Sequence, residues 1–494
     1  MSKILIGWAE ESIVPEKRVM LAGQFYERIS EYVESDITVT AMAVEADGEQ
    51  MIIASVDLVS VSEELLKLAR QKFTAMMKEV APEKIIVSAI HSHTSIGYQA
   101  SGTSATQKIL NEFLPEDRKY TSLVASVRDD VLTPDEAMEF LAEKIALAAK
   151  KAWESREEAF YANAFGRAVV GHCRRVVYDD GSAKMWGDTN SANFVEIEGG
   201  NDSGVELLYT FNKERKLTGV VANIACPAQV LEHRSFISSD YWGKVKQFLR
   251  EKFGDDLYLL ALCGAGGDQC PRDMIRWVNP ETPINDPHVK REHYIERKAD
   301  PSMFDIKGCT LIGKRVANEI IAVYEALDEP KDEAEFKHKV IKYDLPLRKV
   351  TPAEYEQAVR EIEYYVQKNK DKEVFNYEDN AAMYVFAGTI ARYRRQQTEE
   401  TVPVEIHIAK LGNIAIATNP FELFLDYGNR IKARSKAEQT FLCQLTCGSM
   451  GYLPTVKAER GSHYSAYISS GHVGHEGGDM LVRKSVAEIN DMWM

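Results

Sequence analysis

Segments rich in valine and isoleucine alternate with helical patterns along almost the whole chain, and this alternation is the feature that most limits its fold. Ile37 to Val44 and Met51 to Val59 have the pattern of two strands joined by an Asp-Gly turn, which is a hairpin signal. Ser62 then predicts the N-terminus of a helix, and Lys84 to Ile90 predicts the next buried strand. Strands and helices that alternate in this way are typical of a layered α/β fold.

The same pattern returns in the second half of the chain. The elements expected there are a strand at Gly219 to Ala225, a helix over Asp240 to Phe253 capped by Ser239, a strand at Leu257 to Leu262, a helix over Thr310 to Leu327 and two short strands within Ile406 to Thr418, folded at Gly412. We therefore expect layered mixed β-sheets with flanking helices, in the α/β class.

Two segments have the composition of insertions between core elements. Ser101 to Lys151 is largely polar and ends in an amphipathic helix over Asp135 to Lys151, and Thr351 to Gln397 predicts one or two long charged helices. Insertions between core elements often shape the mouth of a site, so we expect the helical insertions near 101–151 and 351–397 to do so. No internal repeat and no linker rich in Pro, Gly or Ser marks a boundary, so we expect residues 1–494 to form one composite domain.

Composition and charge narrow the choice of partners. Sixty Lys and Arg against seventy-five Asp and Glu give a net charge of −15, which disfavours binding to nucleic acid or anionic lipid. No apolar run approaches the roughly 18 residues that span a bilayer, and the N-terminus lacks a secretory pattern. The seven cysteines form no CxxC pair, as expected in a reducing compartment. We expect a cytoplasmic protein with a small-molecule substrate, no nucleic acid and no membrane insertion, and leave homo-oligomer formation open.

The sharpest local feature is the sequence IIVSAIHSHT at residues 85–94, where an apolar strand runs into two histidines. On an extended chain, residues i and i+2 face the same side, so His91 and His93 are expected to point together at the strand end. Two neutral imidazoles form half of a zinc site. A pair of hydrogen-bonded structural histidines is the alternative, because the motif is short and the chain has 11 histidines.

A glycine-rich loop, CGAGGDQCPR at residues 263–272, follows the strand expected at 257–262. Its glycines let the backbone approach a ligand, and Asp268 and Cys270 are placed where an acid or a nucleophile could act. The loop is neither a Walker A sequence nor a dinucleotide fingerprint. The alternative is a tight turn that only caps the strand.

Polar side chains also follow the strand expected at 219–225. Gln229, Glu232 and His233 precede the next helix, although such loop residues are often only solvated. Upstream, Arg174 lies in the sequence HCRR, which fits an anion or carbonyl clamp as well as an ordinary surface salt bridge.

The last hundred residues hold further candidates. Glu422 directly follows an expected strand, and Tyr452 and then Tyr464 come after the next one. His472 and His475 lie in a glycine-rich stretch that is more typical of a flexible, solvated loop than of a metal site.

Taken in order, the blocks IIVSAIHSHTS, HCRR, NIACPAQV with ISSDYWG, LCGAGGDQCPR, NPFE and GYLPT resemble the catalytic domain of the neutral/alkaline, non-lysosomal ceramidases. Several blocks that follow the order of the family, from about position 85 to 465, are harder to obtain by chance than any single motif. The resemblance implies a hydrolase in which one divalent metal ion, Zn²⁺, activates water against an amide. Without a signal peptide or the family's C-terminal immunoglobulin-like domain, we expect a small soluble substrate, such as a sugar or amino-sugar conjugate.

The same resemblance implies roles for individual residues. His91 is a metal ligand, His93 is a ligand or a residue that supports one, and Glu422 and Tyr452 complete the coordination sphere. A further group, consisting of Arg174 and Tyr464, contacts the substrate or stabilises its oxyanion.

This sequence departs from the family at two positions. Pro227 stands where the family has another zinc-binding histidine, so we expect Glu232 or His233 to replace that ligand. Cys270 stands where the family usually has serine, which predicts either a stronger nucleophile or an inert buried thiol.

Two other functions remain open. The scaffold could carry a metal-dependent sugar lyase or isomerase in which Glu422 or His93 moves a proton, or it could bind a ligand without catalysis. If the protein is a metal-dependent enzyme, whether a hydrolase, a lyase or an isomerase, His91 from the first fifth of the chain must lie close to Glu422 and Tyr452 from the last fifth.

Overall fold

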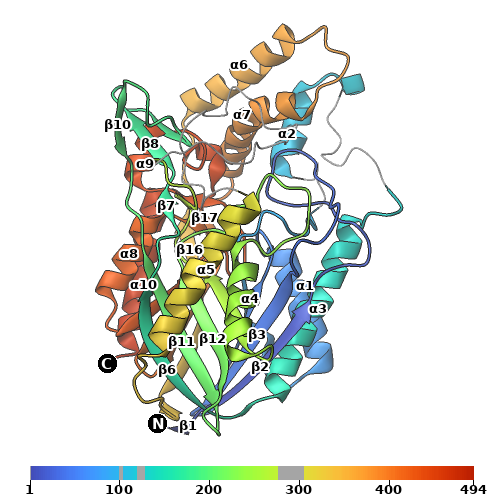
Figure 1. Cartoon of the computed structure of the whole chain (residues 1–494). Helices are drawn as coiled ribbons and strands as arrows, with labels where there is room; N and C mark the ends of the chain where they lie inside the picture. The colour runs from blue at the N-terminus through green and yellow to red at the C-terminus, as the bar shows by residue number, and fades with distance from the viewer. Residues whose placement is uncertain (1, 100–103, 119–127, 276–304) are drawn as a thin grey trace.

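The computed structural model describes residues 2–99, 104–118, 128–275 and 305–494 (Figure 1). The largest sheet in these ranges has eight strands, which are β2 (Leu5–Ser12), β3 (Thr38–Ala46), β4 (Glu49–Val56), β5 (Ile85–Ala89), β6 (Glu157–Arg167), β11 (Gly204–Asn212), β12 (Leu217–Ile224) and β13 (Tyr258–Cys263). Their order is β13-β12-β11-β6-β2-β3-β4-β5. The pairs β12–β13 and β4–β5 at the two edges are parallel, and the pairs between them are antiparallel.

A second sheet lies against the first. It consists of β16 (Phe336–Pro346), β17 (Thr401–Leu411), β18 (Ile414–Thr418) and β20 (Gln439–Cys443), in that order, with β18 and β20 parallel. β20 contacts β11, β12 and β13, and β16 contacts β4. The first strand expected within 406–418 is therefore longer than predicted, because it pairs with β16 along its full length from Thr401.

Helices cover both sheets, as the alternating pattern predicted (Figure 1). α3 (Pro134–Glu154) packs on β2, β3 and β4, and α1 (Glu63–Met76) packs on α3. α4 (Tyr241–Phe253) and α5 (Asp305–Tyr324) lie over the β13 side of the sheet, and α8 (Leu425–Arg434) and α10 (His475–Asp491) cover the smaller sheet. Each helix buries one apolar stripe, which gives the layered α/β architecture expected from the sequence.

The two segments expected to be insertions have different roles. α3 is part of the core, because its face from Ala137 to Trp153 packs in the main hydrophobic cluster. α2 (Ala105–Phe113), α6 (Pro352–Lys368) and α7 (Tyr377–Arg395) instead pack on one another and form a separate hydrophobic cluster. In Figure 1 these three helices gather at the end of the molecule opposite the two chain termini.

Two local predictions are wrong. The N-cap of α4 is Asp240 rather than Ser239, because the Asp240 carboxylate accepts the N–H of Tyr241 and, 2.8 Å away, that of Leu231. The stretch with His472 and His475 is not a solvated loop. The His472 ring accepts hydrogen bonds from two arginines of α7, and His475 begins α10 and pairs with Glu459.

Short elements at the strand ends complete the fold. They are β7 (His172–Cys173), β8 (Arg175–Tyr178), β9 (Ala183–Met185), β10 (Phe194–Ile197), β14 (Gln269–Cys270), β19 (Glu422–Leu423), β21 (Tyr452–Leu453) and α9 (Val456–Gly461). Among the described helices, none has the length and apolar character needed to cross a bilayer.

Arg175 ties β8 to the C-terminal region. Its fully buried guanidinium pairs with Glu198 at 2.6 Å and donates to the carbonyls of Ala458, Ser462 and Tyr464. We expect Arg175→Met to lower the free energy of unfolding by about 3–5 kcal/mol, because it leaves a buried carboxylate without its counter-charge. Denaturant unfolding measures this loss. Arg360→Met, at an exposed pair, is the control and should change stability by about 0.5 kcal/mol or less. Equal effects of the two changes would contradict the expectation.

Candidate metal centre

The residues predicted at strand ends meet at one end of the two sheets. His91 lies two residues beyond β5, Glu422 lies in β19 after β18, and Tyr452 lies in β21 after β20. β19 and β21 pair in parallel, with Glu422 opposite Tyr452. Side chains from distant parts of the sequence therefore share one buried region.

The segment 445–447 connects the two halves of this region. The N–H of Ala89 donates to the carbonyl of Leu445, and the N–H of Cys447 donates to the carbonyl of Val87 at 2.9 Å. The same segment also bonds to the backbone of residues 419–421, just before Glu422. It therefore sets the position of Glu422 relative to β5.

The two histidines converge, although not in the way that an extended strand predicts. His91 has a left-handed φ of +65°, so the chain turns after β5. Its Nδ1 lies 2.6 Å from the carbonyl of Val59, which can only accept, so Nδ1 carries the proton. The Nε2 lone pair then faces His93 Nε2 at 3.3 Å and Glu422 Oε2 at 3.4 Å.

His93 is held from behind by the N-terminal loop. Arg28 donates to its backbone carbonyl at 2.6 Å, and Gly23 lies so close that a Cβ there would stand 2.6 Å from the ring. Burial, followed by the neighbouring His91 and Arg28, lowers the His93 pKa well below 6.5, so the ring is neutral at neutral pH. Its buried Nδ1 makes no hydrogen bond among the described residues and lies 3.5 Å from Glu232 Oε2.

A buried arginine lies beside these groups. Arg174 donates to Gln229 Oε1 at 3.2 Å, to the carbonyl of Gly267 at 3.1 Å and to the Tyr452 hydroxyl at 3.4 Å. The amide of Gln229 in turn donates to Glu232 at 3.2 Å. Gln229 therefore links the cation to the carboxylate near His93.

Charge complementarity fixes the protonation of the surrounding acids. Burial alone would raise the pKa of Glu422, but the charge that His91 carries when it is protonated, the charge of Arg174 and the hydrogen bond from Tyr452 lower it below 4.5, so the group is a carboxylate. Burial raises the pKa of Tyr464 to about 12 and that of Tyr452 well above 10. Both phenols therefore keep their protons at neutral pH, and they hydrogen-bond to each other.

These donors suit a divalent metal ion. His91 Nε2, His93 Nε2, a Glu422 oxygen and the Tyr452 oxygen are a nitrogen and oxygen set of the kind that zinc takes. The backbone carbonyl that fixes the His91 tautomer is the usual support for a ligating histidine. The close approach of the His93 Nε2 to that of His91 is explained when a cation lies between these two atoms.

Glu232 and His233 are the two residues expected to replace the missing family histidine, and they have different surroundings: Glu232 lies beside His93, and His233 lies near Asp305. Glu232 lies on the Nδ1 side of His93, away from the edge that faces His91, which suits a group that orients His93. His233 interacts electrostatically with Asp305, which is paired with Arg234.

Asp268 and Cys270 lie beside the cluster and stabilise its walls. The Asp268 carboxylate accepts the N–H of Leu425 at the start of α8, and its backbone carbonyl accepts the N–H of Arg174 at 2.9 Å. Burial raises the pKa of the Cys270 thiol to about 11, although Arg174 lowers it, so Cys270 is protonated and is a poor nucleophile.

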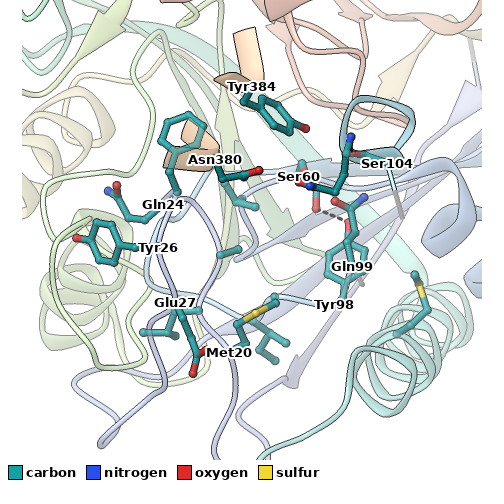
Figure 2. Close-up of a pocket in the computed structure, with 18 of the residues that line it drawn as sticks. Met20, Gln24, Tyr26, Glu27, Ser60, Tyr98, Gln99, Ser104, Asn380 and Tyr384 are labelled. Carbon is teal, nitrogen blue, oxygen red and sulfur yellow. Dashed lines mark hydrogen bonds between the residues drawn. The ribbon is translucent and has the colours of Figure 1, made fainter. Parts of the chain in front are cut away.

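A cavity of about 700 Å³ lies near the cluster, although none of the cluster's own residues is among those that line it (Figure 2). Val59, whose carbonyl holds His91, lines this cavity, and Phe25 in its wall packs on Tyr464 with 5.8 Å between ring centroids. The polar and aromatic lining includes Gln24, Tyr26, Glu27, Glu64, Tyr98, Gln99, Gln107, Asp135, Asn380 and Tyr384. Figure 2 shows Asn380 and Tyr384 of α7 facing residues of the N-terminal loop across it.

Several of these residues carry no sequence signal. Gly23, Arg28 and the residues from Met20 to Glu27 that line the cavity come from a loop without a motif or a periodic pattern. Gln229 was visible only as one of several polar residues in its loop. A glycine whose φ is +95° beside a histidine cannot be recognised before the structure is known.

No model of a known protein family matches the chain, and no curated protein sequence matches it. A neutral ceramidase from Pseudomonas aeruginosa is similar in structure, with a TM-score of 0.66 and 13% identity over 99% of this chain and 75% of that chain. A ceramidase complexed with C2 gives a TM-score of 0.64 and 11% identity over 98% and 74%. The chain therefore has a neutral ceramidase-like fold, as the ordered motifs predicted, at an identity too low to extend the likeness beyond the fold.

The low pKa of His93 has a measurable consequence. The unfolded chain takes up a proton near pH 6.5, whereas folded His93 does so only well below that pH, so its contribution to stability is lost as the pH falls. Relative to His93→Gln, we expect the free energy of unfolding of the metal-free protein to fall by about 1.4 kcal/mol per pH unit below pH 6.5. Urea unfolding of both proteins with chelator, at about pH 7.5 and about pH 5.5, measures it. A pH-independent difference would contradict the buried, neutral state of His93.

Proposed function

We propose that this protein is a metal-dependent hydrolase that cleaves an amide or related bond of a small polar molecule. The observation that supports it most is the meeting of His91, His93 and Glu422 beside the buried cation Arg174, near a cavity. A metal-ion donor set and a fixed positive charge in one water-restricted place are what hydrolysis of a carbonyl compound requires.

In this proposal the ion, for which we favour zinc, supplies Lewis-acid chemistry by polarising the substrate carbonyl and lowering the pKa of water. His91, His93, Glu422 and Tyr452 hold it. Arg174 keeps its charge, because Tyr452, Cys270 and Glu422 outweigh the effect of burial on its pKa, and it stabilises negative charge that develops on the substrate oxygen. Tyr464, protonated at neutral pH, donates to the same oxygen.

The cavity supports a polar substrate. Its wall combines aromatic rings with amides and with the carboxylates of Glu27, Glu64 and Asp135, and the described residues that line it include no lysine or arginine. Rings that stack and amides that hydrogen-bond suit a hydroxylated or amine-bearing molecule such as a sugar or amino-sugar conjugate. Two long hydrocarbon chains would leave these polar groups without partners.

Removal of one histidine tests the proposal. His91→Ala should lower the metal content by one equivalent per chain and reduce the turnover of N-acyl amino sugars by about 100-fold or more, because Lewis-acid assistance is worth several kcal/mol. Elemental analysis and product assays measure both quantities, and His475→Ala, at a histidine paired outside the cluster, is the control. In ¹⁸O-labelled water the acid product should gain one labelled oxygen. A product without label would indicate elimination or isomerisation instead, and unchanged metal content would contradict the donor set.

The position of Glu232 predicts a graded effect. Because it lies on the Nδ1 side of His93, Glu232→Gln should weaken metal affinity by about 10 to 100-fold rather than abolish binding. His233→Gln should leave the affinity unchanged. Chelator competition measures both dissociation constants. Complete loss of metal in Glu232→Gln would show that this carboxylate is a direct ligand. Loss of metal in His233→Gln would contradict the assignment of Glu232, rather than His233, as the residue of this loop that supports metal binding.

A further inference from the structure

A second group of metal-binding side chains lies away from the cavity, between the two sheets. Glu405 and His407 come from β17, and Cys447 comes from the segment that bonds to β5. One ligand atom of each lies within 4.8 Å of those of the other two. His407 is fully buried and Cys447 nearly so. The Glu405 side chain is 16% exposed, so one side of the group is accessible to solvent.

The hydrogen bonds around His407 determine where its lone pair points. His338 Nδ1 lies 3.2 Å from the carbonyl of Gln50 and must donate to it. In a neutral His338 the Nε2 then carries the lone pair and accepts. His407 Nδ1 lies 3.0 Å from that Nε2 and therefore donates to it. In a neutral His407, the Nε2 lone pair then faces Glu405 Oε1 at 3.0 Å.

The cation beside this group is Arg70, which donates to both Glu405 oxygens and, at 3.9 Å, to the Cys447 sulfur. The His407 Nε2 lone pair still faces the carboxylate, which favours a further positive charge among the three groups. A proton on His407 or a bound metal ion would supply this positive charge. Sulfur, imidazole nitrogen and carboxylate oxygen together are the ligands of a borderline-soft divalent ion, and not of magnesium or calcium.

The surroundings have the form expected around a metal site. Arg70 donates to both Glu405 oxygens, at 2.7 and 3.2 Å, which fixes the carboxylate while leaving lone pairs on Oε1. His338 holds the far nitrogen of His407, as supporting residues of ligating histidines do. Two anionic ligands would balance the charge of a divalent ion, and the charge on Arg70 would remain outside the ligand set.

We propose that Glu405, His407 and Cys447 bind a second divalent ion of the zinc class, with a structural role. Cys447 has a left-handed φ of +56° and lies in the segment 445–447 that sets Glu422 against β5. An ion bound there joins β17 to that segment and holds the strained residue in place. The proposal does not depend on the proposed hydrolase function, because its ligands are separate from His91, His93 and Glu422.

Cobalt substitution of the full chain tests the sulfur ligand directly. In the protein reconstituted with Co²⁺, a sulfur-to-cobalt charge-transfer band in the near ultraviolet is expected, since only this site contains a cysteine ligand. The band should vanish in Cys447→Ser and persist in Cys309→Ser and Cys270→Ser, which change other buried cysteines. Absence of the band in the wild-type protein would overturn the proposal without reference to any variant. A band that disappears in Cys270→Ser would assign the sulfur to the other centre and overturn it as well.

Metal counting separates the two centres. Cys447→Ser should lose one equivalent of zinc and become less stable to heat, while Cys309→Ser keeps the wild-type content. If His91→Ala retains the wild-type content but Cys447→Ser loses metal, the hydrolase proposal fails and this one stands. Unchanged zinc content in folded Cys447→Ser would show that the group is satisfied by a proton, as an imidazolium–thiolate pair, and would overturn the proposal.

Discussion

The contact between β5 and the segment 445–447 is the constraint on which the rest of the site depends. Backbone hydrogen bonds on both sides of Ser88 join the segment to the strand, and the Ser88 and Thr446 hydroxyls bond at 2.9 Å across 358 positions of sequence. β5 leads to His91, whereas the segment follows β20, leads on to Tyr452 and bonds to the backbone just before Glu422. The contact therefore brings together the ends of strands that belong to two different sheets.

Several buried arginines of the polar interior are paired with an opposite charge. Arg174 lies among Glu422 and two phenols, Arg175 is matched by Glu198, and Arg70 is matched by Glu405. Buried pairs of this kind contribute little net stability but fix geometry, because a displaced partner leaves an uncompensated charge. Burial lowers the pKa of His93 and of His338, so these two rings are neutral at neutral pH and each keeps one lone pair available.

Much of the fold could be predicted because strand and helix periodicity survives in the sequence, and strand ends correctly located His91, Glu422 and Tyr452. Side-chain direction could not be predicted. The i and i+2 rule fails at His91 because the residue is left-handed, and the side of His93 on which Glu232 lies depends on tertiary packing. The N-terminal loop with Gly23 and Arg28 has no regular hydrophobic period, so its role behind His93 was invisible. α3 resembled an insertion because a long polar stretch precedes it, although its alanine-rich face packs in the core.

The separate packing of α2, α6 and α7 has a consequence for how such a protein can diversify. These helices have a small hydrophobic cluster of their own, and α2 and α7 supply part of the cavity wall, whereas the proposed metal donors lie at the ends of sheet strands. Mutations in the helical unit can therefore reshape what enters the cavity with little effect on the main core or the donors. Selectivity can evolve in one part of the molecule while the chemistry is inherited unchanged in another.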